Sequence, residues 1–302
     1  MASSAGVRAE AVIPDRPLPI RARGAVLLAI LGLGVWAFLA LDLTWAQVIP
    51  TAAGMRQIGE FFSYALRPAL SYRPGEVPDG SPPLLMQALL SARLTLIFAV
   101  TAMSLSVVVG GVLGFLGSTA WWSGDPAGSR TAIGRYARRT VAPAIYATTR
   151  VVITLMRSVH ELIWAVLFLA ALGLNDLSAV IAIAIPFGGT LAKIFSEMID
   201  EAPRDAADAL RGAGATGAQV FCLGLLPRAL PDMSAYALYR LECALRSSAI
   251  LGFFGWETLG YFVKQEWENA DYDQVWTYLY TLLLLVVLVE WWSSGLRRRF
   301  VA

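Results

Sequence analysis

The segment 201–231 reads EAPRDAADALRGAGATGAQVFCLGLLPRALP and lies between two long apolar runs. Small, charged and helix-breaking residues are concentrated in it, whereas the runs on either side are long enough to cross a bilayer. Its backbone polar groups need partners or water, so we expect an ordered structure at the membrane surface. A folded polar loop of this kind indicates contact with a soluble partner.

The composition around this segment is that of an integral membrane protein. Hydrophobic residues make up 57% of the 302 residues and charged residues only 15%, against about 25% charged residues in soluble domains. A helix of roughly 20 apolar residues crosses the hydrocarbon core, and backbone in lipid has to be paired within the helix. The predicted helical spans are Gly24–Leu41, Leu94–Gly117, Val141–Leu174, Leu177–Ile199, Met233–Phe254 and Thr277–Trp292. The third is longer than one crossing and is predicted to be one helix that breaks or tilts near its outer end.

The arginines predict the orientation of these six spans. They are concentrated in the N-terminal tail, in 130–139, in 201–231 and in the C-terminal tail, whereas the alternate loops carry few. Cytoplasmic loops of membrane proteins carry an excess of Lys and Arg. Both termini and the segment 201–231 are therefore expected on the cytoplasmic side.

Turn chemistry predicts two short helices within 201–231. Pro203 suits the first turn of a helix, and Gly214 belongs to a glycine pair that ends or bends it. Thr216 and Gln219 have the spacing of a capping box for a second helix. That helix is expected to stop before Pro227, since the residue ahead of a proline disfavours the helical region.

The spacing within this segment resembles the coupling loop of ABC-importer permeases. The family pattern is Glu-Ala-Ala, three residues, Gly, nine residues, Ile, one residue, Leu-Pro; here Asp replaces the Glu and Gly replaces the Ile. The matching residues, with the alanine after the central glycine, are Asp208, Ala209, Leu210, Gly214, Ala215, Gly224, Leu226 and Pro227.

Three further stretches resemble permeases of phosphonate importers. They are MRSVHELIWAVLFLAALGL (156–174), LAKIFSEMIDE (191–201) and YALYRLECALRSSAILGFFG (236–255). The resemblance implies an all-α fold of six transmembrane helices, with a type I, methionine-importer-like permease core and one extra N-terminal helix. It also implies a pathway for phosphonate or a related phosphorus oxyanion such as phosphite or phosphate.

The same resemblance implies partners and a location. We expect a cytoplasmic ATPase dimer that carries ATP and Mg, with no cofactor on this chain. A periplasmic or lipid-anchored binding protein and a second permease subunit, identical or related, are also expected, in the bacterial inner membrane. The expected domains are a cytoplasmic tail (1–23), the first helix and periplasmic loop (24–90), the permease core (91–293) and a basic cytoplasmic tail (294–302). Where the family often has a glycine-rich stretch, residues 255–260 read GWETLG, so the outer gate or the substrate preference is expected to differ.

Polar residues within the spans are costly in lipid and are candidates for the substrate pathway. Arg157, His160 and Glu161 are expected on one helical face through their i, i+3 and i+4 spacing. Arg157 either pairs with Glu161 or lines the path, and Arg246 either lines the path or forms an ion pair. Lys193 is expected to pair locally with a glutamate one turn on. The full candidate set is Arg157, Ser158, His160, Glu161, Arg246, Ser247 and Ser248.

Other chemistry is not indicated. The sequence has no Gly-x4-Gly-Lys-Ser/Thr phosphate-binding loop, and a single histidine beside one glutamate does not make a metal site. Gly110, Gly111 and Gly114 are expected to serve close helix packing. Two alternatives to an importer stay open on the residues alone, namely a membrane enzyme acting on lipid head groups and an ion-driven secondary transporter.

Overall fold

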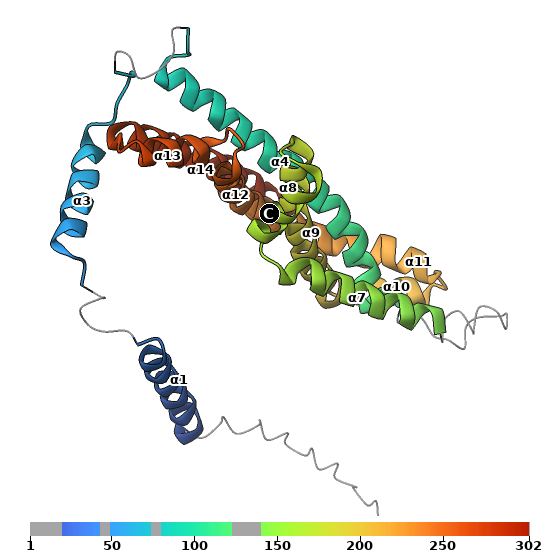
Figure 1. The fold of residues 1–302 in the computed structure, drawn as a ribbon. Coiled ribbons are helices and arrows are strands. Elements are labelled where there is room, and N and C mark those ends of the chain that lie inside the picture. Colours follow the sequence, from blue (N-terminus) through green and yellow to red (C-terminus); the bar gives the residue numbers. More distant parts are fainter. Residues whose placement is uncertain (1–19, 43–48, 74–79, 123–139, 302) are drawn as a thin grey trace, which may run out of the picture. The chain divides into compact units, whose positions relative to one another are not determined.

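The computed structural model describes residues 20–42, 49–73, 80–122 and 140–301. The chain forms two compact units, Met1–Glu60 and Phe61–Ala302. Throughout the described ranges, the regular elements are helices (Figure 1). The far N-terminal tail and the arginine-rich segment 130–139 lie outside the described residues.

The helices follow one another in a simple order. In the first unit lies α1 (Ile20–Ala40), and α3 (Ala52–Ser63) runs across the boundary into the second. The second unit contains η1 (Tyr64–Leu66), α4 (Leu84–Gly117), α5 (Thr119–Trp122), α7 (Ala142–Ser158), α8 (Glu161–Leu172), α9 (Asp176–Glu201), α10 (Asp205–Gly212), α11 (Gly217–Gln219), η4 (Val220–Leu225), α12 (Leu226–Ile250), η5 (Leu251–Phe254), α13 (Leu259–Glu268) and α14 (Tyr272–Val301).

The predicted spans correspond to helices, with shifted ends. Within the described ranges, α4, α9 and α14 are long and apolar enough to cross a membrane, and α7 with α8 forms a fourth candidate bent by 91°. The helix α4 begins ahead of the predicted Leu94 because polar residues interrupt the apolar pattern without interrupting the helix. The apolar part of α1 is shorter, and α12 is long but too polar for the same criterion. Six crossings therefore stay a prediction. The break in the third span is confirmed, but it lies between Ser158 and Glu161, near the middle of the run rather than near its outer end.

Glycines bring α4 and α9 into backbone contact. A Cβ placed on Gly110 would lie 2.7 Å from the Cβ of Leu191, and one on Gly114 would lie 2.9 Å from the Cβ of Phe195. Gly111 faces open space instead. The predicted role in helix packing is thus confirmed for two of the three glycines and is wrong for Gly111, which lies on the other side of the helix.

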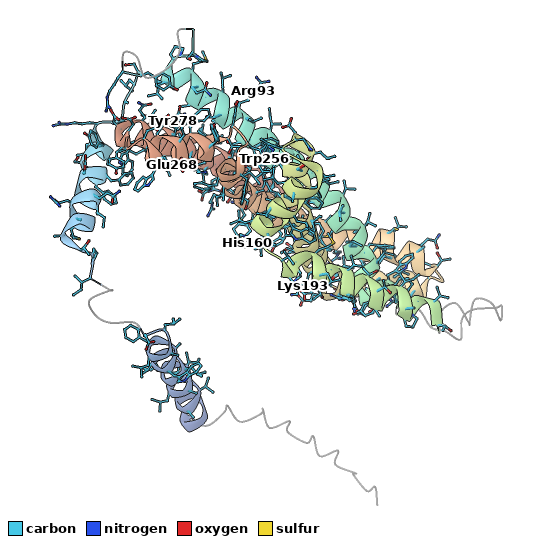
Figure 2. All side chains as sticks on the ribbon, in the orientation of Figure 1. Arg93, His160, Lys193, Trp256, Glu268 and Tyr278 are labelled. Carbon is cyan, nitrogen blue, oxygen red and sulfur yellow. The ribbon has the colours of Figure 1, made fainter. Side chains whose placement is uncertain are left out.

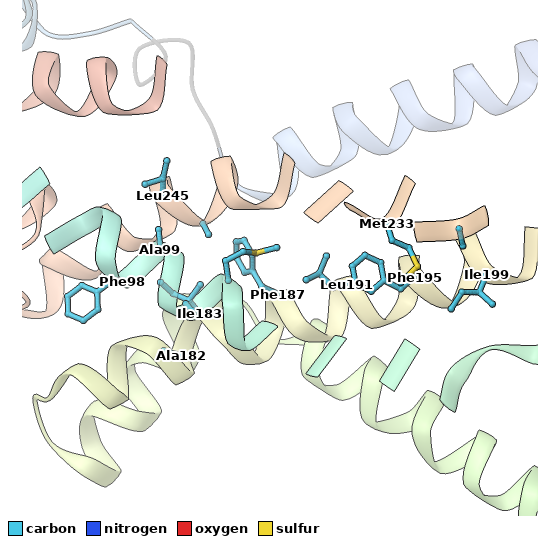
Figure 3. Packing of buried hydrophobic residues seen from close by; sticks show 14 of the residues in the cluster. Phe98, Ala99, Ala182, Ile183, Phe187, Leu191, Phe195, Ile199, Met233 and Leu245 are labelled. Atoms are coloured by element: carbon cyan, nitrogen blue, oxygen red, sulfur yellow. The ribbon is translucent and has the colours of Figure 1, made fainter. Parts of the chain in front are cut away.

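The helix α9 is at the centre of the second unit. In its apolar stretch 61% of the residues are buried, compared with 33% in α4 and 6% in α14. Figure 3 shows Ile183, Phe187, Leu191 and Phe195 in a row along α9, with Leu245 of α12 in the same core. Aliphatic and aromatic side chains of α9 fill the space that the α4 glycines leave by having no side chain of their own.

The segment 61–73 packs onto the start of α14, although the sequence assigned it to a loop ahead of the core. The indole of Trp276 donates a 2.7 Å hydrogen bond to the carbonyl of Phe61, and the hydroxyl of Thr277 donates to the carbonyl of Ala69 at 2.6 Å. Arg73 forms ion pairs with Asp271 and Asp273. The second unit consequently begins at Phe61. The predicted domain division between residues 90 and 91 stays a prediction.

The contact between α4 and α9 predicts opposite effects for two neighbouring substitutions. Gly110→Ala places a methyl group against Leu191, and overpacking of this kind costs about 1–3 kcal/mol of stability. Gly111→Ala adds the same methyl group in open space, where alanine stabilises a helix by roughly 0.5–1 kcal/mol over glycine. Thermal unfolding of the detergent-purified chain is expected to show a lower midpoint for the first variant and an equal or higher midpoint for the second. Equal midpoints for both would contradict the packing described here.

Candidate functional site

The polar segment folds into a helix that ends at a glycine elbow. The helix α10 closes with hydrogen bonds from the N–H of Gly214 to the carbonyl of Arg211 and from the N–H of Ala215 to the carbonyl of Leu210, both 3.0 Å. Gly214 has φ +82°, a conformation in which a residue with a Cβ is disfavoured. The predicted bend at Gly214 is confirmed, although α10 starts at Asp205, just after the proline that was expected in its first turn.

The second half of the segment starts as predicted and ends differently. Thr216 caps α11 and forms a complete capping box with Gln219. The chain then passes through the π-helical turn η4 into α12, which contains Pro227 in its first turn. The expectation that the helix stops before Pro227 is wrong. A π turn shifts the hydrogen-bond register by one residue, and a proline at the start of the following helix has no N–H to leave unpaired.

Gly224 holds the two halves of the segment together. A Cβ on Gly224 would lie 3.1 Å from the Cα of Ala207 and 3.3 Å from a methyl group of Leu210. Ala207 is itself only 1% exposed. The departure from the family pattern at Gly224 therefore has a local cause, because the branched side chain of isoleucine does not fit where α10 lies against η4.

The residues of the coupling pattern divide into a surface and its support. Exposed side chains or backbone belong to Asp208, Ala209, Gly214 and Pro227, whereas Gly224 is buried and Leu210, Ala215 and Leu226 are half-buried. Below them, Phe221 contacts the aromatic rings of Phe115 and Trp121. The exposed part is a small-residue elbow fixed to the membrane helices by an aromatic base.

The second group of candidate residues surrounds the break between α7 and α8. His160 is the N-cap of α8, and its Nδ1 accepts a hydrogen bond from the N–H of Leu162 at 3.3 Å. Arg157 lies in the last turn of α7. The helix therefore changes direction between Arg157 and Glu161, and the prediction that these residues share one helical face is wrong.

Glu161 connects α8 to α12. Its Oε1 accepts a 2.8 Å hydrogen bond from the hydroxyl of Ser247, and its Oε2 lies 3.5 Å from Nε2 of His160. Arg157 makes no hydrogen bond or ion pair within the described residues, so the proposed pairing of Arg157 with Glu161 is not formed.

The other candidates differ in how available they are. Ser248 is fully buried and donates to the carbonyl of Thr95 at 2.9 Å, and Ser158 donates to the carbonyl of Thr154 within its own helix. Arg246 is exposed and has no ion pair in the described part of the chain. Among these candidates, Arg157 and Arg246 are thus exposed and without a partner in the described residues, whereas the exposed His160 contacts Glu161.

The stretch 255–260 has a structural explanation. The indole of Trp256 donates to the carbonyl of Asn175 at 3.1 Å, and the hydroxyl of Thr258 donates to the carbonyl of Ala249 at 3.0 Å. A Cβ on Gly260 would lie 2.1 Å from the same carbonyl. Of the residues that depart from the family pattern, Glu257 is the exposed one.

The partners of two charged residues of α12 were missed in the sequence. Glu242 is buried in α12 and accepts a 2.8 Å hydrogen bond from Arg297 of α14, a residue that was assigned to the basic tail. Arg240 lies over the ring of Phe187 at 4.4 Å. A buried carboxylate is strongly destabilising without a partner, but the sequence does not show which residue supplies it. The local pair of Lys193 with Glu197, at 2.9 Å, was predicted and is confirmed.

The described residues contain no cluster of three or more His, Cys, Asp or Glu side chains suited to a metal ion. The candidate functional residues are those of the elbow and of the α7–α8 break.

Known proteins with similar sequences are transport permeases. The chain is 33% identical over 158 residues to the phosphite transport system permease protein PtxC of Stutzerimonas stutzeri, covering 52% of this chain and 58% of that protein. It is 31% identical over 170 residues to the phosphate-import permease protein PhnE of Mycolicibacterium smegmatis, covering 56% of this chain and 32% of the relative. The matched region therefore spans little more than half the length of the first relative and about a third of the second.

Solved structures show the same fold. The inward-facing MetNI methionine ABC transporter matches with a TM-score of 0.58 at 23% identity, covering 73% of this chain and 99% of that one. An amino acid ABC transporter matches with a TM-score of 0.56 at 17% identity, covering 71% and 94%. The predicted all-α, methionine-importer-like permease fold is confirmed.

A family model described as the binding-protein-dependent transport system inner membrane component matches residues 126–301, which include the elbow, the α7–α8 break and the whole of α12. The chain belongs to this family of multi-pass inner-membrane transport components.

Proposed function

We propose that this chain is the transmembrane permease subunit of an ATP-driven importer for a phosphorus oxyanion. The observation that carries the proposal is the elbow at Gly214, an exposed small-residue surface built on a fixed aromatic base. Small residues at the elbow let a partner's backbone approach closely. Family membership favours transport over the two alternatives considered above, a lipid head-group enzyme and an ion-driven transporter.

The substrate class is supported by the relatives and by the chemistry of the exposed side chains. Relatives with similar sequences are described as phosphite and phosphate permeases. Arg157 and Arg246 present free guanidinium groups, which form short, charge-assisted hydrogen bonds with phosphorus oxyanions. Without a tight ring of donors around them, such groups bind an anion weakly enough to release it.

The proposed assembly has the elbow facing the cytoplasm. There a separate ATPase dimer carries ATP and Mg, and both termini of this chain lie on the same side. A binding protein, periplasmic or lipid-anchored, delivers the oxyanion from outside, and a second permease subunit, identical or related, completes the pathway. The proposed domains keep the predicted limits, with the coupling segment at 201–231 inside a core of 91–293.

A charge placed on the elbow is expected to uncouple the ATPase. Ala209→Lys adds a long cation to an exposed position, where it prevents close approach of the partner without disturbing the core. We expect loss of co-purification with the ATPase, or at least a tenfold fall in the ATP hydrolysis that the permease and the substrate-loaded binding protein stimulate. A loss of about 1.4 kcal/mol of binding free energy is a factor of ten in affinity. Ala53→Lys, the same change on the exposed side of α3, is the control and is expected to behave like wild type. Normal ATPase coupling in Ala209→Lys would exclude the proposed role of the elbow.

The shape of the elbow gives a second test with a closer control. Gly214→Ala forces a Cβ into a left-handed conformation at a cost of roughly 1–2 kcal/mol, although space around it is open. Gly212→Ala also enters open space, without a positive φ. Hydrogen exchange of 205–219 is expected to become faster in the first variant and slower or unchanged in the second. Equal exchange in both variants would be incompatible with the observed turn.

The pathway arginines are tested by uptake. Arg157→Gln and Arg246→Gln each remove a charge-assisted donor, which contributes about 1.5–3 kcal/mol, so phosphite or phosphonate uptake is expected to fall at least tenfold while basal ATP hydrolysis persists. Arg298→Gln removes an equally exposed cation from the end of α14 and serves as the control. If uptake by all three variants equals that of wild type, the two arginines do not contact substrate.

A further inference from the structure

A second polar feature lies on α4, outside both groups described so far. Arg93 is the single charged residue of this 34-residue helix and is exposed on it (Figure 2). It makes no hydrogen bond or ion pair with any described residue. An arginine in an apolar spanning helix is costly unless it finds an anion or reaches the interface.

Arg93 lines a hollow of about 390 Å³ together with an acidic residue from the loop ahead of α13. That residue is Glu257, which is exposed and likewise without a partner among the described residues. The rest of the lining is polar toward the start of α4 and apolar further along, and consists of Gln87, Leu90, Ser91, Leu94 and Ile97. One cation and one anion thus face a common space and do not neutralise each other directly.

The length of α4 places the hollow near a membrane surface. With a rise of 1.5 Å per residue, α4 is about 51 Å long, whereas the hydrocarbon core is about 30 Å thick. A centred helix extends about 10 Å beyond the core at each end, and Arg93 lies about 14 Å from Leu84 along the axis. Arg93 is then just inside the core boundary, from which arginine side chains extend to the head groups.

We propose that this hollow binds a phosphoryl group that carries an amine, with the phosphoryl oxygens on Arg93 and the ammonium group on Glu257. Arg93 supplies charge-assisted donors for the oxyanion, and Gln87 adds an amide. A purely anionic group would be repelled by Glu257, and a quaternary ammonium has no N–H to donate to it. The apolar lining by Leu90, Leu94 and Ile97 suits the glycerol and acyl part of a lipid.

Two sources supply this chemistry; the first rests on the orientation given under the proposed function, and the second falls within the substrate class proposed there. One is the head group of phosphatidylethanolamine in the outer leaflet, and the other is a free aminoalkylphosphonate. The two are distinguished by the apolar contacts, which only the lipid uses. If the hollow binds neither ligand, the proposed role of the elbow still stands, because the coupling tests above do not involve α4.

The test uses the full chain, delipidated in detergent, and native mass spectrometry with dioleoyl phosphatidylethanolamine, phosphatidylglycerol and phosphatidylcholine. Phosphatidylethanolamine is expected to bind most tightly. Arg93→Gln is expected to weaken it about tenfold, as for loss of a hydrogen bond to a charged group, and Glu257→Gln is expected to abolish its preference over phosphatidylglycerol. Lys264→Gln and Glu268→Gln change a half-buried cation and an exposed anion that pair with each other on α13, outside the hollow, and are the controls.

A calorimetric titration with 2-aminoethylphosphonate in the same detergent identifies the source. Binding of the free compound, lost in Arg93→Gln, with no retention of phosphatidylethanolamine assigns the site to a soluble ligand; the reverse result assigns it to the lipid. The proposal is overturned if neither compound binds, or if Arg93→Gln binds both as wild type does. It is also overturned if that variant changes only the oligomeric state, since the hollow would then be covered by a second copy of the chain.

Discussion

Backbone contact between α4 and α9 is the interaction on which the second unit depends. Lipid is as apolar as leucine, so helices in a membrane gain stability from close packing and from hydrogen bonds between helices rather than from burial of apolar area. Gly110 and Gly114 allow this approach on one side of α9, and Gly189 allows the approach of α7, where a Cβ would lie 2.7 Å from the Cβ of Met156. With α9 held on two sides, its remaining surface is left for α8 and α12.

Polar contacts between helices define relative helix positions that close packing at glycines does not define by itself. The hydroxyl of Thr95 accepts a hydrogen bond from the N–H of Leu259, while its carbonyl accepts one from Ser248. Thr95 therefore joins α4 to α12 and to the start of α13. The buried pair of Glu242 with Arg297 joins α12 to α14. Because an unpaired charge at Glu242 would be strongly unfavourable, this pair also sets the register of α14 against α12.

The sequence predicted the features that depend on local chemistry. Apolar runs identified the helices, and the capping box at Thr216 and the bend at Gly214 were found where expected. Two errors arose where the regular helical pattern is broken locally. Pro227 was expected to end a helix, but a π turn ahead of it restores the register; residues 157–161 were expected on one face, but His160 starts a new helix. Spacing along one helix also gives no information about a partner on another, so the contacts of Glu161 with Ser247 and of Glu242 with Arg297 were not predictable from it.

The continuity of α12 relates the two candidate regions physically. The elbow leads through η4 into α12, and no loop separates them. At the start of this continuous segment, Gly224 of η4 lies against Ala207. Near the C-terminal end of α12, the hydroxyl of Ser247 donates a hydrogen bond to Glu161 at the start of α8. The helix α12, at 1.5 Å per residue, spans about 37 Å, enough to cross the hydrocarbon core. On the coupling role proposed for the elbow, a movement there is transmitted along α12, which contains an internal proline at Pro231, to the residues at the α7–α8 break. Coupling over such a distance requires an element with two arrangements that both sites bias, and the hydrogen bond between Ser247 and Glu161 is the contact between α12 and α8 on which we expect such a movement to act.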